Sequence, residues 1–165
     1  MNGPNSNLSV PPVMPSHGSL SNIMFAGHNP LARLHMDISQ HQRATLLERF
    51  ISNVDPLVKI FHVPTLRRFI QSDVSPGNNT FKRKQKDAVL ATILFAAVTS
   101  MTDEDCQNQL KLTRAQALPR HKAAVEAALV EADFLGHHDF TTLQALVLFL
   151  VCYLLYGFSI LLTNL

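Results

Sequence analysis

The residues of this chain with the richest acid–base and metal-ligand chemistry are its histidines, and His62 has the most unusual setting. The segment NVDPLVKIFHVPT (residues 53–65) places this histidine among two prolines, an acid, a lysine and branched apolar residues. Histidine changes charge near neutral pH and is the commonest protein ligand for metals. Because proline stiffens the backbone, the segment suits a metal ligand on a stiff loop, a catalytic histidine or a structural joint.

The remaining histidines lack the partners that a metal site needs. His35 and His41 are not spaced as i and i+4, and no acidic third ligand is suitably placed. His137 and His138 are adjacent, so in a helix they would point in different directions. We interpret the pair as a solvated turn and expect no metal site.

The acidic run DED (residues 103–105) and the cysteine after it belong to a predicted short helix. Thr102 with Asp105 three residues later is a capping signal, and acidic residues in a first turn complement the helix dipole. Cys106 has no neighbouring histidine or lysine that would lower its pKa, and Cys152 is too distant in sequence to suggest a disulfide framework. No phosphate loop, nucleophile elbow or zinc-protease motif occurs. We therefore predict neither an enzyme nor a bound cofactor.

One basic cluster is a candidate contact for phosphate or a nuclear import signal, comprising Lys82, Arg83, Lys84 and Lys86. The structural alternative is a solvated helix start. Lysines at a helix N-terminus oppose the dipole, which favours placing the cluster in the preceding loop. The net charge of +2 is too small to indicate nucleic-acid binding by itself.

The apolar pattern that must position these residues is helical. Residues 41–54 have one apolar face, residues 88–98 form an alanine-rich apolar run suited to a central helix, and residues 114–133 repeat the helical period around Pro119, a kink or the true start. Gly136 suits a left-handed cap and Asp139 an N-cap for the following helix. No β-hairpin signal appears. These patterns predict an all-α fold, an irregular helical array that is incomplete at its C-terminus.

Composition divides the chain into three zones. Residues 1–30 are rich in Pro, Ser and Asn and predict a disordered leader; residues 31–152 form the globular domain; and residues 153–165 are an atypical apolar tail. Residues 145–162 contain no charge, which meets the minimum length for a membrane span. That stretch is equally typical of a helix buried inside a larger array.

The order of four motifs is more specific than any one of them. The chain contains NVDPLVKIFHVPT, then AVLATILFAAVTSMTDEDC, then AAVEAALVEADFLGHHD and finally a Leu-Gln-Ala helix. Between about residues 44 and 152 this order resembles the fungal-specific transcription factor domain, the middle homology region of fungal zinc binuclear cluster regulators. The residues that match the family motifs include Val54, Pro56, His62, Pro64, Thr65, Ser100, Cys106, Glu126, Leu143, Gln144 and Ala145.

The resemblance implies a non-catalytic, all-α regulatory domain of a nuclear transcription factor. It implies protein partners, and DNA and zinc only through a six-cysteine cluster, which this chain with its two cysteines lacks. The tail YLLYGFSILLTNL also departs from the polar turn and Trp-containing helix of the family. We therefore expect a fragment of a fungal regulator.

Such a fragment would leave several apolar side chains short of partners and would favour self-association or poor solubility. The side chains concerned are Phe149, Leu154, Leu155, Phe158 and Leu161. The alternative is a tail-anchored membrane protein with residues 145–162 as its span, although no Lys or Arg follows Lys122 to set an orientation.

The interpretation of His62 as part of a structural joint is the one that fits the resemblance. Pro56 is predicted to start a short turn, Val63 to be extended before Pro64, and Thr65 to begin the next helix. In this reading the imidazole of His62 is hydrogen-bonded between two helices.

Overall fold

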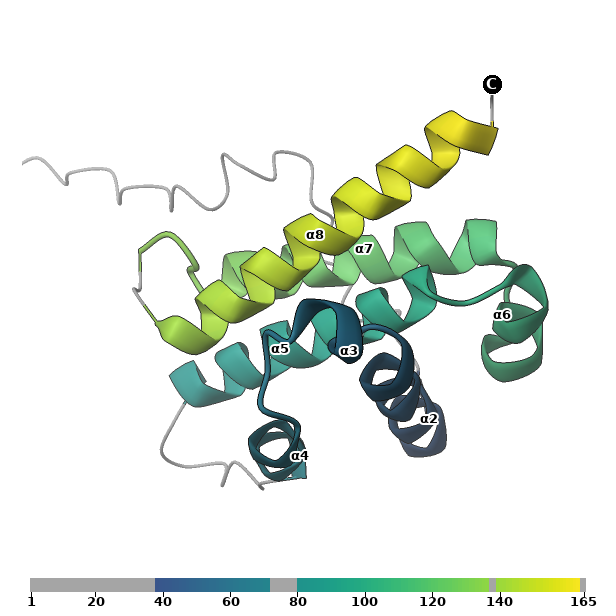
Figure 1. Ribbon diagram of the computed structural model, residues 1–165. Helices are drawn as coiled ribbons and strands as arrows, with labels where there is room; N and C mark the ends of the chain where they lie inside the picture. The colour runs from purple at the N-terminus through teal and green to yellow at the C-terminus, as the bar shows by residue number, and fades with distance from the viewer. Residues whose placement is uncertain (1–37, 72–79, 137–138, 164–165) are drawn as a thin grey trace, which may run out of the picture.

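A computed structural model describes residues 38–71, 80–136 and 139–163 of the 165. Within these ranges the chain forms helices and no strands, which confirms the all-α prediction (Figure 1). The helices, labelled as in Figure 1, are α2 (Gln40–Asn53), α3 (Asp55–Val58), α4 (Val63–Gln71), α5 (Thr80–Thr99), α6 (Asp103–Leu110), α7 (Arg114–Glu131) and α8 (Phe140–Thr163). The predicted leader at residues 1–30 lies outside the described residues.

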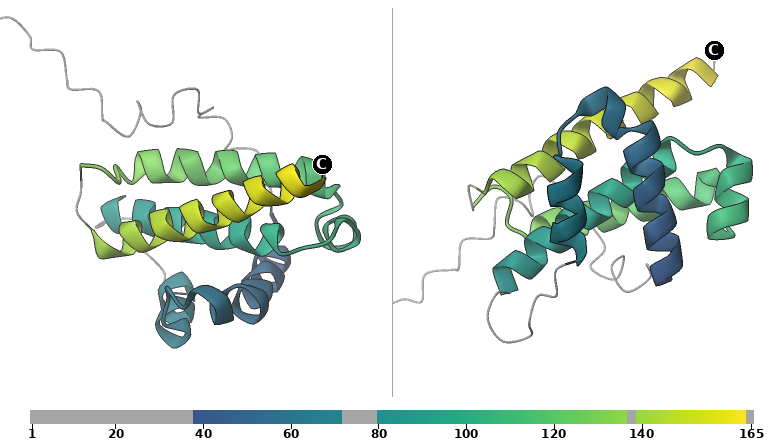
Figure 2. Two further views of the ribbon diagram at one scale, coloured as in Figure 1. Left: turned by 45° about the horizontal axis from the view of Figure 1, so that its top comes forward. Right: turned by 60° about the horizontal axis from the view of Figure 1, so that its bottom comes forward.

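Helix α5 is the centre of the array. It packs most extensively against α7 and α8 and then against α2, and Figure 2 shows α7 and α8 lying along it, with α2, α3 and α4 grouped on another side. From Ala88 to Val98 all but one of its side chains are buried, including Phe95 at 0% exposure. The alanine-rich run is therefore the central helix that the sequence predicts, because its small side chains allow close approach of several neighbours.

The N-terminal elements follow their local signals. Ser39 and Gln42 form a capping box that starts α2, and Leu46 and Phe50 on its inner face are fully buried. The chain then turns sharply: α3 has a proline in its first turn and ends at Lys59, whose φ of 47° is left-handed.

Helix α4 begins at Val63, two residues earlier than predicted, so the expectation of an extended Val63 is wrong. The amide of Leu66 donates to the carbonyl of His62, which makes His62 the residue before the first helical turn. Pro64 is accommodated because the first-turn amides of a helix have no carbonyl partner within it.

The following turns confirm one cap, decide one open alternative and correct one expectation. Thr102 and Asp105 form the predicted capping box of α6. Pro119 lies inside α7, which begins at Arg114, so this proline does not start the helix. After α7 the left-handed residue is Asp133, with φ 49°, and not Gly136. A Cβ at Gly136 would lie 2.2 Å from the carboxylate of Asp133, so a larger residue at this position would have to displace that side chain.

Helix α8 begins as predicted at the side chain of Asp139, whose Oδ2 accepts from the amide of Thr142 at 2.9 Å. The helix runs without a break to Thr163, and the stretch Phe140–Gly157 is long and apolar enough to cross a membrane, with a mean hydropathy of 1.8. Only 28% of that stretch is buried within the described chain. In Figure 1 its last turns extend beyond the other helices.

Candidate functional site

Three of the motif residues meet at a pocket between the α3–α4 joint and the start of α8. The pocket has a volume of about 340 Å³ and includes His62, Thr65 and Gln144, residues that are up to 82 positions apart in sequence. Apolar side chains from α4, α5 and α8 supply most of the remaining lining, which comprises Phe61, Leu66, Phe69, Val89, Phe140 and Thr141. The first and the last of the four sequence motifs therefore meet in space at one joint.

Gln144 is the residue that ties this joint to α8. Its Nε2 donates to the carbonyl oxygen of Ile60 at 2.6 Å across 84 positions of sequence. Ile60 follows the left-handed Lys59, where the chain leaves α3 and its carbonyl has no helical partner. The neighbouring Ala145 is fully buried, whereas Leu143 is 53% exposed. The Leu-Gln-Ala motif thus combines one outward, one bridging and one core residue.

His62 bonds to a side chain in the first turn of its own helix and does not bridge two helices. The imidazole is exposed, and its Nδ1 lies 2.8 Å from Oγ1 of Thr65 in the first turn of α4. The expectation of a hydrogen bond from this ring to a second helix is therefore wrong. The His–Thr pair lies where the chain passes from α3 into α4, so a structural role at this joint stays a prediction.

Asp55 is a buried acid in the joint that the sequence reasoning did not single out. It is only 3% exposed, and its Oδ2 lies 3.5 Å from Nζ of Lys59, while Oδ1 is buried without a hydrogen-bond partner among the described groups. It occupies the first position of α3, between the buried Val54 and the exposed Pro56. Its place before proline at a helix start, where acids favour the dipole, is the signal that identifies it.

The motif residues at the end of α5 and in α6 serve packing and ion pairing. Oγ of Ser100 donates to the carbonyl of Ala97 at 2.7 Å, which closes the last turn of α5. Cys106 is fully buried, and burial raises the pKa of its thiol. Asp105 pairs with Arg49 at 2.8 Å, and this hydrogen bond holds the carboxyl pKa below its ordinary value. None of these three groups is poised as a nucleophile or base.

Glu126 acts at the contact between α7 and α8. Its Oε1 lies 2.7 Å from Nζ of Lys122, and the same ammonium lies 5.3 Å from the ring centroid of Tyr153 on α8. The carboxylate therefore holds a cation over an aromatic ring.

His121, also on α7, is a buried histidine that the sequence reasoning missed. It is 3% exposed, its Nδ1 lies 2.8 Å from the carbonyl of Ala117, and Nε2 is buried without a partner among the described residues. Because a carbonyl only accepts, Nδ1 bears the proton and Nε2 is the bare nitrogen. Burial lowers the pKa of this ring. The helical spacing of the buried positions in α7, which includes residue 121, is the signal that places it.

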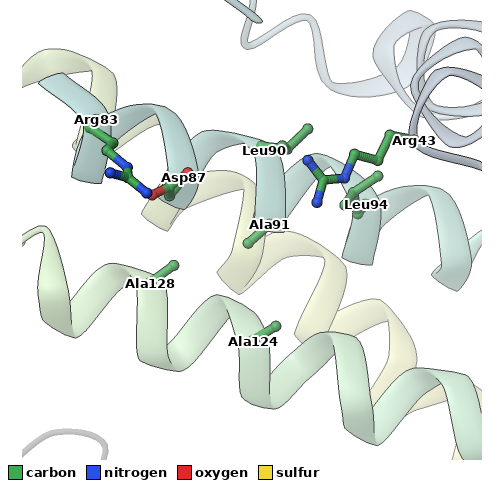
Figure 3. Close-up of a pocket in the computed structure, with 8 residues that line it drawn as sticks. All are labelled: Arg43, Arg83, Asp87, Leu90, Ala91, Leu94, Ala124 and Ala128. Atoms are coloured by element: carbon green, nitrogen blue, oxygen red, sulfur yellow. The ribbon is translucent and has the colours of Figure 1, made fainter. Parts of the chain in front are cut away.

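The basic cluster lies in the first turns of α5 and not in a preceding loop. Lys82, Arg83 and Lys84 are exposed, while Lys86 is half-buried. Figure 3 shows that Arg83, beside Asp87, borders a second pocket of about 430 Å³, with Arg43 of α2 near Leu94 on the same pocket. The pocket is lined by Arg43, Arg83, Asp87, Leu90, Ala91, Leu94, Ala124 and Ala128.

Among the described residues no three histidine, cysteine or acidic side chains gather as a metal site. His35, His137 and His138 lie outside the described residues, as do the side chains of Phe158 and Leu161. Phe149 was expected to lack partners, and that expectation is wrong: it is 2% exposed and its ring lies 5.6 Å from that of Phe95. Leu154 and Leu155 are 64% and 63% exposed, as expected.

Comparison with known protein families identifies the array. The model of the fungal specific transcription factor domain matches residues 47–160, which covers the second half of α2, all of α3 to α7 and most of α8. The chain belongs to this family. The resemblance inferred from the four motifs is thereby confirmed.

Curated relatives are named as transcription factors. The pyriculol/pyriculariol biosynthesis cluster transcription factor 1 of Pyricularia oryzae is 37% identical over 64% of this chain and 14% of its own length. The aurofusarin cluster transcription factor aurR2 of Gibberella zeae is 39% identical over 64% of the chain and 16% of its own length. The C6 finger domain transcription factor nscR of Aspergillus fumigatus is 27% identical over 87% of the chain.

The chain spans only 19% of the length of that last relative. No solved structure matches the chain. The comparisons therefore show that the chain corresponds to a segment of much longer transcription factors. Its architecture is the helical array around α5.

Proposed function

We propose that this chain is a non-catalytic, helical regulatory domain that acts in the nucleus through protein contacts and controls transcription of a biosynthetic gene cluster. The observation that supports this most is the family match over residues 47–160, which coincides with one continuous array around α5. The gene-cluster target is suggested by the names of the relatives from Pyricularia oryzae and Gibberella zeae.

The absence of catalysis is part of the proposal and is supported by what the candidate groups do. The thiol of Cys106 is buried, the carboxylate of Asp105 is paired with Arg49, and the imidazole of His62 is hydrogen-bonded to Thr65 in its own helix. Among these three groups, none is a nucleophile that has another of them as an adjacent base.

DNA recognition would come from outside this chain. A zinc binuclear cluster needs six cysteines, and the chain has two, both buried among the described helices. Any zinc would belong to a cluster in another segment, and the exposed residues Lys82, Arg83 and Lys84 are suited to nuclear import more than to base recognition, since no aromatic side chains alternate with them.

A reporter assay tests the proposal. The full chain, fused to an unrelated DNA-binding domain and expressed in a fungal host, is expected to change reporter transcription relative to that DNA-binding domain alone. A fusion with Phe95→Ala, which opens the core, is the control for effects that do not need the fold. A fusion present in the nucleus that leaves the reporter unchanged would contradict a regulatory role.

The membrane alternative has a separate test, because α8 is apolar enough to span a bilayer. The inner face of α8 packs on α5 and Gln144 bonds to Ile60, so we expect alkaline carbonate to release the tagged chain from any membrane fraction. Retention of the chain in the membrane pellet would favour the tail-anchored alternative.

A further inference from the structure

The pocket between the α3–α4 joint and the start of α8, the joint pocket, has the size of a small-molecule site. Its volume of about 340 Å³ lies within the range of about 300–1,000 Å³ that is typical of ligand pockets. A cavity of about 150 Å³ is enough for benzene, so the joint pocket has room for about two fused rings. A single phenylalanine ring from another segment would fill less than about half of it, because that ring is the size of benzene.

The floor and walls of the joint pocket are apolar and largely aromatic. Leu66 and Val89 contribute buried side chains, at 3% and 0% exposure. Three phenylalanines come from three different elements: Phe61 from the joint, Phe69 from α4 and Phe140 from α8. Aromatic rings pack best edge-to-face or in offset stacks against other rings. The lining therefore suits a flat aromatic molecule.

The polar groups of the joint pocket retain hydrogen-bonding capacity. Nδ1 of His62 bonds to Thr65, and Nε2 of Gln144 donates to Ile60. Among the described groups, neither Nε2 of His62 nor Oε1 of Gln144 has a hydrogen-bond partner. The amide oxygen only accepts, whereas the ring nitrogen donates or accepts according to its tautomer. A hydroxyl group suits both, because it can donate to the amide oxygen and accept from a ring N–H.

The absence of acidic, lysine and arginine side chains from the described lining of the joint pocket favours a neutral ligand. The second pocket differs, because Arg43, Arg83 and Asp87 line it (Figure 3). An anion that entered the joint pocket would lose hydration without gaining a cationic partner.

We propose that the joint pocket binds a neutral, planar aromatic molecule of about two fused rings that carries a hydroxyl group. The rings pack against the phenylalanines of the joint, α4 and α8, and the hydroxyl bonds to Gln144 or His62. Because its walls come from α4 and α8, the bound molecule adds contacts between the joint and the helix that Gln144 already connects. The inference does not rest on the proposed transcriptional role, since it uses only the lining of the pocket.

Titration of the full chain with 2-naphthol tests the proposal. This probe has two fused rings and a hydroxyl and is uncharged at neutral pH, and its fluorescence is readily followed because the chain contains no tryptophan. We expect one molecule to bind per chain with a Kd of about 10–100 µM. Naphthalene-2-sulfonate carries the same rings with a negative charge, and it should bind at least about tenfold more weakly.

Two substitutions that fill the pocket from different walls locate the binding. Thr141→Phe on α8 and Thr65→Phe on α4 each place a ring in the space for the probe, and each should weaken 2-naphthol binding at least about tenfold. Leu143→Phe is the matched control: it adds the same ring to α8 at a residue that is 53% exposed and does not line the pocket, so it should leave the Kd unchanged. Circular dichroism checks that each variant keeps its helices.

Nuclear Overhauser contacts in the wild-type chain locate the probe without any substitution. We expect the protons of 2-naphthol to contact the methyl groups of Leu66 and Val89 in the joint pocket. Contacts to Leu90 and Leu94 in their place would assign the probe to the second pocket and overturn the proposal.

Three results of the titrations would also overturn it. They are an absence of saturable 2-naphthol binding, equal affinity for naphthalene-2-sulfonate, and folded Thr141→Phe and Thr65→Phe chains that bind 2-naphthol as well as the Leu143→Phe chain does.

Discussion

Helices α5 and α8 are both long and apolar, yet they differ in what covers them. Between Ala88 and Val98, α5 meets neighbours on every side, and its charged residues are confined to the first turns. Helix α8 has no charge at all, and it presents one face to α5 and the opposite face to solvent. Apolar composition alone therefore does not tell how much of a helix is buried. The helices that pack around it decide that.

The largest expected effect concerns the buried contact between α5 and α8. Phe95→Ala removes a fully buried ring that lies 5.6 Å from the ring of Phe149, and it should lower the free energy of unfolding by about 3–5 kcal/mol. Leu155→Ala, at a residue of α8 that is 63% exposed, should change it by less than about 0.5 kcal/mol. Urea unfolding of both variants measures the difference, and similar losses would mean that α8 is covered like α5.

The next largest effect concerns the hydrogen bond between α8 and the α3–α4 joint. Gln144→Ala removes the donor to the carbonyl of Ile60 and should destabilise the fold by about 1–3 kcal/mol. Gln107→Ala is the matched control, because the side-chain amide of Gln107 bonds to Asp103 on an exposed surface. Thermal melts of the two variants compare them directly, and an unchanged midpoint for Gln144→Ala would show that the joint does not depend on α8.

A pH effect is expected from His121, a buried residue of α7. Burial lowers the pKa of His121, so the folded chain binds fewer protons than the unfolded chain, where histidine titrates at about 6.5. Stability should therefore fall as the pH drops below about 6.5 towards the lowered value. Melting temperatures measured from pH 8 to pH 5 should show this decline, and His121→Gln should flatten it; an equal decline in the variant would assign the effect to other groups.

The smallest effect sharpens the contact of α7 with α8. Glu126→Gln breaks the pair with Lys122, whose side chain is partly exposed, and should cost about 0.5 kcal/mol or less. Urea unfolding at low and high salt measures it. A loss of several kcal/mol would mean that the contact of the Lys122 ammonium with Tyr153 is one of the main interactions that hold α8 in place.

Local signals carried much of the fold. The capping box at Thr102 and the N-cap at Asp139 were predicted from their own sequence neighbourhoods, because a cap is decided within four residues. The central role of residues 88–98 was predicted from the length and small size of the run. The start of α4 at Val63 was not predicted. Proline disfavours helical backbone at the residue before it, yet Val63 adopts that backbone as the first residue of α4.

The site was predictable only in part, because it depends on contacts distant in sequence. The motif residues His62, Thr65 and Gln144 were identified, but their meeting at one pocket follows from the packing of α4 and α8. For the same reason the hydrogen bond across the joint was assigned to His62, whereas Gln144 makes it. The burial of Phe149 was missed because its partner Phe95 lies 54 positions earlier in the chain.

The most direct test of the two-sided α8 is the rate at which a thiol on its outer face reacts. Leu143→Cys introduces that thiol, while the native Cys106 and Cys152, at 0% and 2% exposure, serve as internal references in the same molecule. The new thiol should label at least about 100-fold faster than both native thiols, which react only when the fold opens. Labelling of the new thiol as slow as that of Cys106 would show that the outer face is covered within the chain and would contradict the comparison.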